Sequence, residues 1–255
     1  MTSERGAAVR KIRGMRIMFE DRDIIVVEKS VGLLTCETRR GGEYTVESAL
    51  TDYVRKGQAK SSKRVYLVHR LDRETSGVMM VAKSEDVQEY FRSRWNEITE
   101  KTYLARVAGR MESECGVFES HLLEDESTLK VHSVAPSVPG AKFARTEWRT
   151  VPDPLAAASP GDCAGTTLVE VKLHTGRKNQ IRVHFAEAGH PVIGDAKYSA
   201  PGVRPPRRAK RGERLCLHAL SLAFVHPHTG ERMEFSTPAP DFAAPRGRRT
   251  GNRPT

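Results

Sequence analysis

The segment His69 to Gly77, HRLDRETSG, constrains this chain most, because it sets one carboxylate among cations and turn-forming residues directly before an apolar run. The run Val78 to Ala82 has the length and composition of a buried strand. The Thr-Ser-Gly that ends the segment favours a turn ahead of that strand. We therefore expect Asp72 to lie on a loop that leads into a strand. Taken alone, the segment could also be an ordinary charged turn.

Composition describes a globular chain without a membrane span. Its 255 residues are 38% apolar and 29% charged, which is enough for one sizeable core or two small ones. No apolar run approaches 18 residues, and the basic start of the chain lacks the apolar centre of a secretory signal. The cysteines stand apart, without a CxxC pair, at Cys36, Cys115, Cys163 and Cys216. This spacing argues against a disulfide framework and a zinc site, and favours a reducing, cytoplasmic compartment.

The net charge of +10 is concentrated in three segments. Residues 1–16, 204–214 and 245–255 are rich in arginine and lysine, whereas the rest of the chain is slightly acidic. Such basic extensions suit a polyanionic partner such as RNA, to which they would contribute phosphate attraction. A solvated tail that keeps the protein soluble is an equally good interpretation of the last segment.

Alternation, caps and turns predict an α+β fold with an extended, mixed, mainly antiparallel sheet flanked by helices and loops. Thr45 and Ser84 are expected to cap helices that end near residues 56 and 95, and a third helix should span about 179–188. Residues 152–165 and 199–214 are expected to be loops. Strands are predicted at 15–19, 23–27, 101–108, 116–123, 143–150, 166–174, 215–225 and 232–236, besides the one at 78–82. We expect a basic extension at 1–14, one catalytic domain at 15–240, and a basic, disordered tail at 241–255.

Several segments together resemble one family. HRLDRETSG is similar to the HRLDxxTSG signature of the RluA-type pseudouridine synthases. The segment from Leu173 to Tyr198 resembles the family's LxTGRxHQIRxH…GHPxxGDxxY, and Lys101 to Gly109 resembles its KxYxAxVxG strand. Ile24 to Leu33 resembles its opening strand, and the match covers most of residues 24–220 in the family's order. Two departures stand out: Asn179 occupies a position where histidine is usual, and Ser30 occupies one where proline is usual.

The resemblance implies an RNA uridine-to-pseudouridine isomerase with a central active-site cleft. It makes Asp72 the catalytic nucleophile, Arg182 the cation that pairs with it, and Tyr103 a residue that stacks on the target base and acts as an acid or base at carbon 5. From its alternation along the strand alone, Tyr103 would be sheet core. An unpaired carboxylate in a dry pocket would take up a proton, so the reaction needs a cation against Asp72. The residues implied in substrate binding are Lys29, His69, Arg70, Thr75, Gly176, Arg177 and Gln180.

The isomerisation transfers no net electrons and no phosphate, so we expect no cofactor and no metal. His69, His184 and His190 could suggest metal ligands, but without a partner cluster we interpret them as hydrogen-bonding scaffold. Asp72 could attack the pyrimidine ring, attack the sugar carbon, or abstract a ribose proton to give a glycal, and the sequence leaves these routes open.

The substrate is expected to be 23S-type ribosomal RNA or transfer RNA, bound by a monomer without an obligatory protein partner. The N-terminal RNA-binding domain of many relatives is not expected here, because only about 14 residues precede the first strand. Two alternatives are a non-catalytic RNA-binding or ribosome-assembly factor on the same scaffold, and a carboxylate-dependent hydrolase. A hydrolase is disfavoured because the chain has no second acidic residue within a recognisable motif. The presence of Asp72 argues against a non-catalytic factor.

Overall fold

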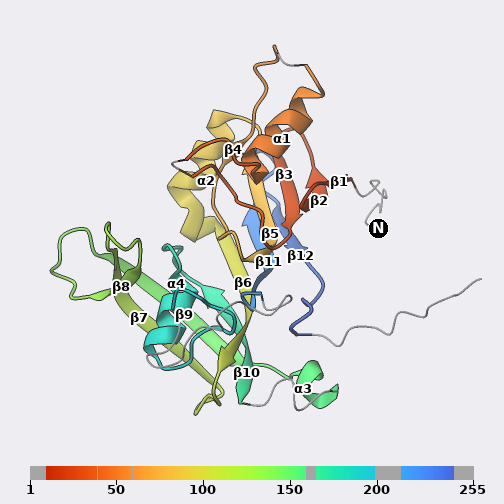
Figure 1. Ribbon diagram of the computed structural model, residues 1–255. Helices are drawn as coiled ribbons and strands as arrows, with labels where there is room; N and C mark the ends of the chain where they lie inside the picture. Colours follow the sequence, from red (N-terminus) through yellow and green to blue (C-terminus); the bar gives the residue numbers. More distant parts are fainter. Residues whose placement is uncertain (1–9, 39, 59, 159–164, 199–213, 244–255) are drawn as a thin grey trace, which may run out of the picture.

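The computed structural model describes residues 10–38, 40–58, 60–158, 165–198 and 214–243, and these form one long sheet (Figure 1). Within them every strand pair is antiparallel except β5 with β11. The predicted mixed, mainly antiparallel α+β fold is therefore confirmed. In the order of the sheet, the strands are β1 (Lys11–Ile12), β2 (Met15–Glu20), β3 (Ile24–Lys29), β5 (Ser76–Ala82), β11 (Leu217–Val225), β6 (Thr99–Ala108), β10 (Thr166–Leu173), β9 (Lys142–Thr150), β7 (Cys115–Glu124) and β8 (Val131–Val134), while β4 (Tyr66–Leu67) pairs with β5 and β12 (Arg232–Ser236) with β11.

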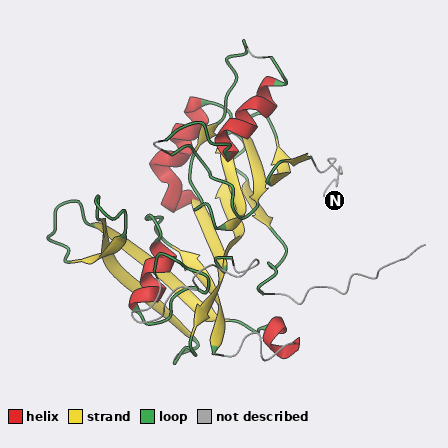
Figure 2. Cartoon of the chain, viewed as in Figure 1, coloured by secondary structure: helices red, strands yellow, loops and turns green. Residues whose placement is uncertain are grey.

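The helices lie on both faces of this sheet (Figure 2). They are α1 (Val46–Arg55), α2 (Glu85–Ile98), α3 (Pro154–Ala158) and α4 (Gln180–Glu187). The buried apolar residues of α1, together with Ile181 and Phe185 of α4, belong to one apolar cluster, which also contains Tyr103 of β6. The buried residues of α2 belong to a second cluster, together with side chains of β3 and β5 that alternate with those in the first cluster. Helices α1 and α4 therefore cover the face of the sheet on which Tyr103 lies, and α2 covers the opposite face.

Both predicted helix caps are present. At the start of α1, the Thr45 hydroxyl accepts a hydrogen bond from the Ser48 amide at 3.0 Å, and the Ser48 hydroxyl accepts one from the Thr45 amide at 2.9 Å. At the start of α2, the Ser84 hydroxyl accepts from the Val87 amide at 3.3 Å. These bonds satisfy amides that a helix leaves free, so the sequence fixes where both helices begin.

Strand β5 positions the HRLDRETSG loop at the centre of the sheet. All of its residues are buried, and it has β3 on one side and β11 on the other. Gly77 lies where β5 meets β11, with φ of +115°, and a Cβ there would come within 2.0 Å of the Ala219 carbonyl oxygen. Only glycine allows this approach, so the last residue of the segment is needed to hold the loop against β11.

The structure also corrects several expected elements. Residues 154–158 form α3 inside a predicted loop, because Asp153 caps it through the Leu155 and Ala156 amides and Pro154 suits its first position. The short strands β1, β4 and β8 were not predicted. Each is two to four residues long and owes its conformation to a neighbouring strand rather than to its own pattern.

The ends of the predicted catalytic domain also shift. Lys11 and Ile12 pair with β2, so the sheet begins inside the predicted N-terminal extension. Phe242 and Ala243 are buried in the core, inside the predicted tail. Arg214, expected to belong to a basic loop, instead donates to the Ser76 hydroxyl at 2.5 Å and pairs with Asp241 at 3.5 Å. The other predicted basic residues of 204–214 and 245–255, and residues 1–9, lie outside the described residues. None of the helices α1–α4 is long and apolar enough to cross a membrane.

Candidate active site

Asp72 lies on the loop before β5, as predicted, and faces a pocket between this loop and the start of α4. The Thr75 amide donates to the Asp72 carbonyl at 3.1 Å, which closes the turn that leads into the strand. The Asp72 side chain is 33% exposed. The pocket is lined by Arg70, Leu71, Asp72, Thr75, Tyr103, Leu173, Arg177, Asn179, Gln180, Ile181, Arg182 and Leu217. The expected central cleft is therefore present, and it gathers all three predicted catalytic residues.

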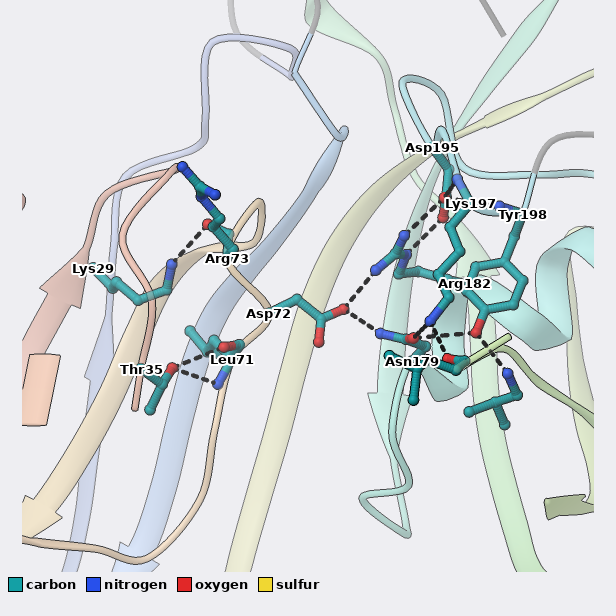
Figure 3. A network of polar contacts seen from close by, with 12 residues as sticks. Lys29, Thr35, Leu71, Asp72, Arg73, Asn179, Arg182, Asp195, Lys197 and Tyr198 are labelled. Carbon is teal, nitrogen blue, oxygen red and sulfur yellow. Dashed lines mark hydrogen bonds and ion pairs between the residues drawn. The ribbon is translucent and has the colours of Figure 1, made fainter. Parts of the chain in front are cut away.

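One oxygen of the Asp72 carboxylate is held from α4 (Figure 3). Its Oδ2 accepts hydrogen bonds from Arg182 Nη1 at 2.8 Å and from Asn179 Nδ2 at 2.6 Å. Among the described residues, Oδ1 has no hydrogen-bond or ion-pair partner. The carboxylate is thus fixed through one oxygen while the other remains available to a ligand in the pocket.

Arg182 is itself held by a second carboxylate. Its Nε and Nη2 donate to the two oxygens of Asp195, at 2.6 and 2.8 Å, in a bidentate pair. The Asp195 side chain is fully buried and also accepts from the amides of Lys197 and Tyr198. Burial disfavours the charged guanidinium, but the hydrogen bonds and charge of Asp195, followed by those of Asp72, outweigh it and raise the pKa of Arg182. Arg182 therefore keeps its positive charge at any pH at which the protein is folded.

Asn179 links the Asp72 carboxylate to Tyr198 and Lys197 through its side-chain amide. Its side-chain oxygen accepts from the Tyr198 hydroxyl at 3.1 Å and from Lys197 Nζ at 3.3 Å, while its amide nitrogen donates to Asp72. The backbone of Asn179 is left-handed, with φ of +54°, a conformation that asparagine tolerates better than most residues. The departure from the family pattern thus lies in direct contact with Asp72, the predicted nucleophile, which the sequence did not reveal.

The backbone on both sides of Asp72 is held by the other half of the molecule (Figure 3). The Thr35 hydroxyl donates to the Leu71 carbonyl at 2.8 Å and accepts from the Leu71 amide. Lys29 Nζ donates to the carbonyls of Leu33, Ser30 and Arg73, at 2.8, 3.1 and 3.2 Å. Lys29 is fully buried, and burial lowers its pKa to about 8, against the opposing charges of Glu74 and Asp72. Its predicted contact with substrate is not supported, because its ammonium group bonds to three backbone carbonyls and does not line the pocket.

Tyr103 combines the two interpretations that the sequence left open. It is 9% exposed and packs in the core, yet it also lines the pocket opposite Asp72. No described residue is a hydrogen-bond partner of its hydroxyl. Burial, followed by the charge of Asp72, raises the pKa of Tyr103. The phenol therefore stays protonated near neutral pH.

The predicted substrate-binding residues divide into exposed or half-buried residues at or beside the pocket and buried residues. Arg70 is exposed and lines the pocket. Arg177 also lines the pocket, and its Nε donates to the Phe143 carbonyl at 2.8 Å. Gly176 is exposed beside the pocket, where a Cβ would meet nothing. Buried Gln180 makes internal bonds: its Oε1 accepts from the Thr175 hydroxyl and the Arg177 amide, and its Nε2 donates to Thr146 and the Arg145 carbonyl. Thr75 is also buried. Gln180 therefore shapes the loop rather than binding substrate through its amide.

His69 does not line the pocket, so its predicted substrate contact is not supported. Its Nε2 accepts from the Met80 amide at 3.1 Å, and its ring stacks on Trp95 at 4.6 Å. Burial, followed by the charge of Lys101, lowers the pKa of His69 to about 3, so the ring is neutral. His184 and His190 each bond to neighbouring hydroxyl or carbonyl oxygens. The interpretation of all three as scaffold is confirmed by these bonds.

Among the described residues, one group of side chains has metal-ligating atoms close together. Asp21, Asp23 and His226 lie far along the sheet from Asp72, and their ligand atoms are within 4.8 Å of one another. His226 pairs with Asp21 at 2.9 Å, and His228 pairs with Asp23 at 2.9 Å. Because these carboxylates and imidazoles already satisfy one another, ion pairing accounts for the group. The expected absence of a metal stays a prediction.

Sequence reasoning missed five residues that hold Asp72 or its partners: Thr35, Asn179, Asp195, Lys197 and Tyr198. Asp195 and Tyr198 belong to the GDxxY part of the family pattern, so a signal for them was present. Asn179 was noticed only as a departure. Thr35 and Lys197 carry no motif, and only the tertiary structure shows their contacts.

Comparison with known proteins identifies similar chains of one family. The family model described as RNA pseudouridylate synthase matches residues 23–187. An uncharacterized RNA pseudouridine synthase of Aquifex aeolicus is 33% identical over 231 residues, covering 89% of this chain and 70% of that protein. The dual-specificity RNA pseudouridine synthase RluA of Yersinia pestis is 31% identical, covering 88% of this chain and 99% of that protein. Against a ribosomal large subunit synthase D and a synthase C, the chain spans only 63% and 64% of their length.

A solved structure, human RNA pseudouridylate synthase domain containing 4, superposes with a TM-score of 0.67 at 26% identity, covering 90% of each chain. The chain therefore belongs to the RNA pseudouridylate synthase family, a class of isomerases that convert uridine in RNA to pseudouridine. The predicted family and fold are confirmed.

Proposed function

We propose that this protein isomerises a uridine in structured RNA through Asp72. The observation that supports this most directly is the carboxylate itself, which has one oxygen fixed by Arg182 and Asn179 and the other open to the pocket. In the reaction, the N1–C1′ bond breaks, the base turns, and a C5–C1′ bond forms. The C5 hydrogen leaves as a proton and N1 gains one, so atoms and electrons balance within the uridine and solvent.

In this proposal, Oδ1 of Asp72 carries the chemistry. Arg182 and Asn179 stabilise negative charge on Oδ2 and prevent rotation of the carboxylate, so Oδ1 is presented to the substrate in a fixed direction. Attack on the ring, attack on the sugar and proton abstraction all begin from this ionised oxygen. The three routes therefore remain equivalent for this site.

Tyr103 is assigned a narrower role than the sequence suggested. A phenol whose pKa is raised can donate a hydrogen bond and offer an aromatic face, but it is a poor base near neutral pH. We assign it base stacking and hydrogen-bond donation. Removal of the C5 proton then falls to Asp72, the carboxylate that lines the same pocket.

The substrate is proposed to be ribosomal or transfer RNA, and the name of one relative, a ribosomal large subunit pseudouridine synthase, supports the first of these. The target uridine would be turned out of its stack at a cost of a few kcal/mol. Arg70, exposed at the edge of the pocket, is placed to occupy the gap that this uridine leaves. We further propose that the protein acts as a monomer in the cytoplasm. The described cysteines Cys36, Cys115 and Cys216 are free thiols, as a reducing compartment favours.

Release of tritium from RNA made with 5-³H-uridine tests this function, because the C5 hydrogen must leave. The wild-type protein should release tritium and form pseudouridine, Asp72→Asn should bind the same RNA without release, and Tyr103→Phe should keep part of the activity. RNA binding by the wild type without release on any ribosomal or transfer RNA would support the non-catalytic alternative. Tritium release by purified Asp72→Asn would remove the assignment of the nucleophile.

A further inference from the structure

A second cavity lies at the end of β5 opposite to Asp72. It is lined by Arg10, Glu20, Arg22, Tyr53, Val54, Lys56, Lys63, Arg64 and Lys83. Lys83 directly follows β5, whereas Asp72 lies just before this strand. Seven strand residues at about 3.3 Å each place the two sites roughly 20 Å apart. The cavity is therefore separate from the active site.

Both sites lie on the same face of the sheet. Tyr53 and Val54 are in α1 and pack against the apolar cluster that contains Tyr103 and, from α4, Ile181 and Phe185. A molecule lying across this face could reach the Asp72 pocket and the cavity together. In Figure 1, α1 and the β2–β3 hairpin stand at the end of the molecule away from α4.

The cavity is strongly cationic. Its lining has six arginine or lysine side chains and a single carboxylate, Glu20. That carboxylate is already bonded, to Lys83 Nζ at 3.0 Å and to the Tyr53 hydroxyl at 2.7 Å. Arg10, Lys56 and Lys63 have no carboxylate within ion-pair distance among the described residues. Several positive charges are thus left without an internal counter-charge around one hollow.

The walls of the cavity are held in place. Arg55 Nε donates to the Lys63 carbonyl at 3.0 Å and fixes the segment after α1 against the helix. The Arg10 guanidinium donates to the Tyr53 hydroxyl at 2.5 Å and lies over the Tyr53 ring. A cluster of like charges repels itself, and its retention around a hollow indicates an anionic ligand.

We propose that this cavity binds backbone phosphates of the substrate RNA, in a segment distant from the target uridine. The inference rests on the proposed function, because it takes RNA as the substrate. Lysine and arginine without internal partners suit phosphates, which they neutralise with release of counterions. Such contacts position the RNA without reading its sequence, so they should select longer RNAs and leave the choice of uridine to the Asp72 pocket.

The test uses Lys56→Gln with Lys63→Gln, because neither ammonium group makes a hydrogen bond or ion pair among the described residues and folding should be preserved. The matched control is Arg94→Gln with Arg232→Gln. It removes the same charge, but from exposed residues that pair with Glu97, Glu100 and Glu234. Each protein is assayed by tritium release on a short stem-loop around the target uridine and on a longer RNA that extends beyond it.

On the long RNA, the cavity variant should lose about 0.7 to 0.9 in the slope of log affinity against log salt for each phosphate contact, or about 1.4 to 1.8 in all. Relative to the control, its KM should therefore worsen by about 7- to 12-fold more at 50 mM than at 200 mM salt. Its kcat should be unchanged, and the short stem-loop should show no difference.

Equal slopes of log affinity against log salt for the cavity variant and the control would overturn the proposal. This is also the result expected if the cavity binds a protein instead of RNA. An equal loss on short and long RNA would also overturn it, because a free small anion or an effect on the active site would then be responsible. Failure of the proposed function differs from both, since the wild type itself would then release no tritium.

Discussion

The two sides of the Asp72 loop are held by different chemistry (Figure 3). On the side of β3, Lys29 and Thr35 bond to backbone groups of Leu71 and Arg73, the residues that flank the nucleophile. On the side of α4, Arg182 and Asn179 bond to the Asp72 carboxylate itself. The first set fixes where the nucleophile stands, and the second fixes where its carboxylate points.

This difference has energetic consequences. Bonds to the loop backbone involve neutral carbonyls and a buried ammonium, so their loss should change stability more than chemistry. The α4 side contains two carboxylates around one guanidinium, so its loss should affect stability and turnover together. Only on the α4 side can a second substitution restore the free energy of unfolding without restoring activity.

Arg182→Met should have the largest effect. It leaves the fully buried Asp195 carboxylate without its cation, a loss of about 3–5 kcal/mol in the free energy of unfolding. Tritium release should also fall below detection. Urea unfolding and the tritium assay measure the two effects. Arg182→Met with Asp195→Asn should recover much of the stability but none of the activity, and recovery of both would show that Arg182 acts only as scaffold.

Lys29→Met should change the pH dependence of stability. The pKa of Lys29 is lowered to about 8 in the folded protein from 10.5, so above pH 8 the folded state releases this proton before the unfolded state does. Stability of the wild type relative to the variant should therefore rise between pH 8 and 10.5, by about 3 kcal/mol at most. Urea unfolding of both proteins at several pH values isolates Lys29, since other groups are shared. Parallel profiles would contradict the burial of a charged Lys29.

Asn179→Gly should lower turnover by about 10- to 100-fold, because the carboxylate loses one of its two anchors while the left-handed backbone remains allowed. Asn179→Ala should show the same loss of turnover and a further loss of stability of about 1 kcal/mol from backbone strain. Asn179→His, which restores the usual family residue, should keep more activity than either. If glycine leaves turnover unchanged, Arg182 alone orients Asp72.

Thr35→Val should have the smallest effect, a loss of about 1 kcal/mol in the free energy of unfolding with a modest decrease in turnover. Valine keeps the shape of the buried threonine but leaves the Leu71 amide and carbonyl without their partner. Thr38→Val, on the exposed part of the same segment, is the control. A larger loss of turnover than Asn179→Gly causes would reverse the comparison between the two sides.

The sequence predicted the elements that carry their own local signals. Caps at Thr45 and Ser84 and the alternation of the long strands predicted α1, α2 and most of the sheet, while β1, β4, β8 and α3 were missed. For the site, the fixed letters of two motifs identified Asp72 and Arg182, and the structure places them 2.8 Å apart. These two residues could be predicted from the sequence because each occupies a fixed position of a family motif.

What the sequence by itself determined was thus the family and the fold class, and it predicted Asp72 as the nucleophile and Arg182 as its cation. The tertiary structure decided which groups face the pocket. It moved Lys29 and His69 from substrate binding to internal bonding, and it brought Asn179 to Asp72 across 107 residues of chain. The physical reason is that hydrogen-bond partners are set by distance in space, and residue types alone do not say whether a donor reaches a ligand or a neighbouring carbonyl.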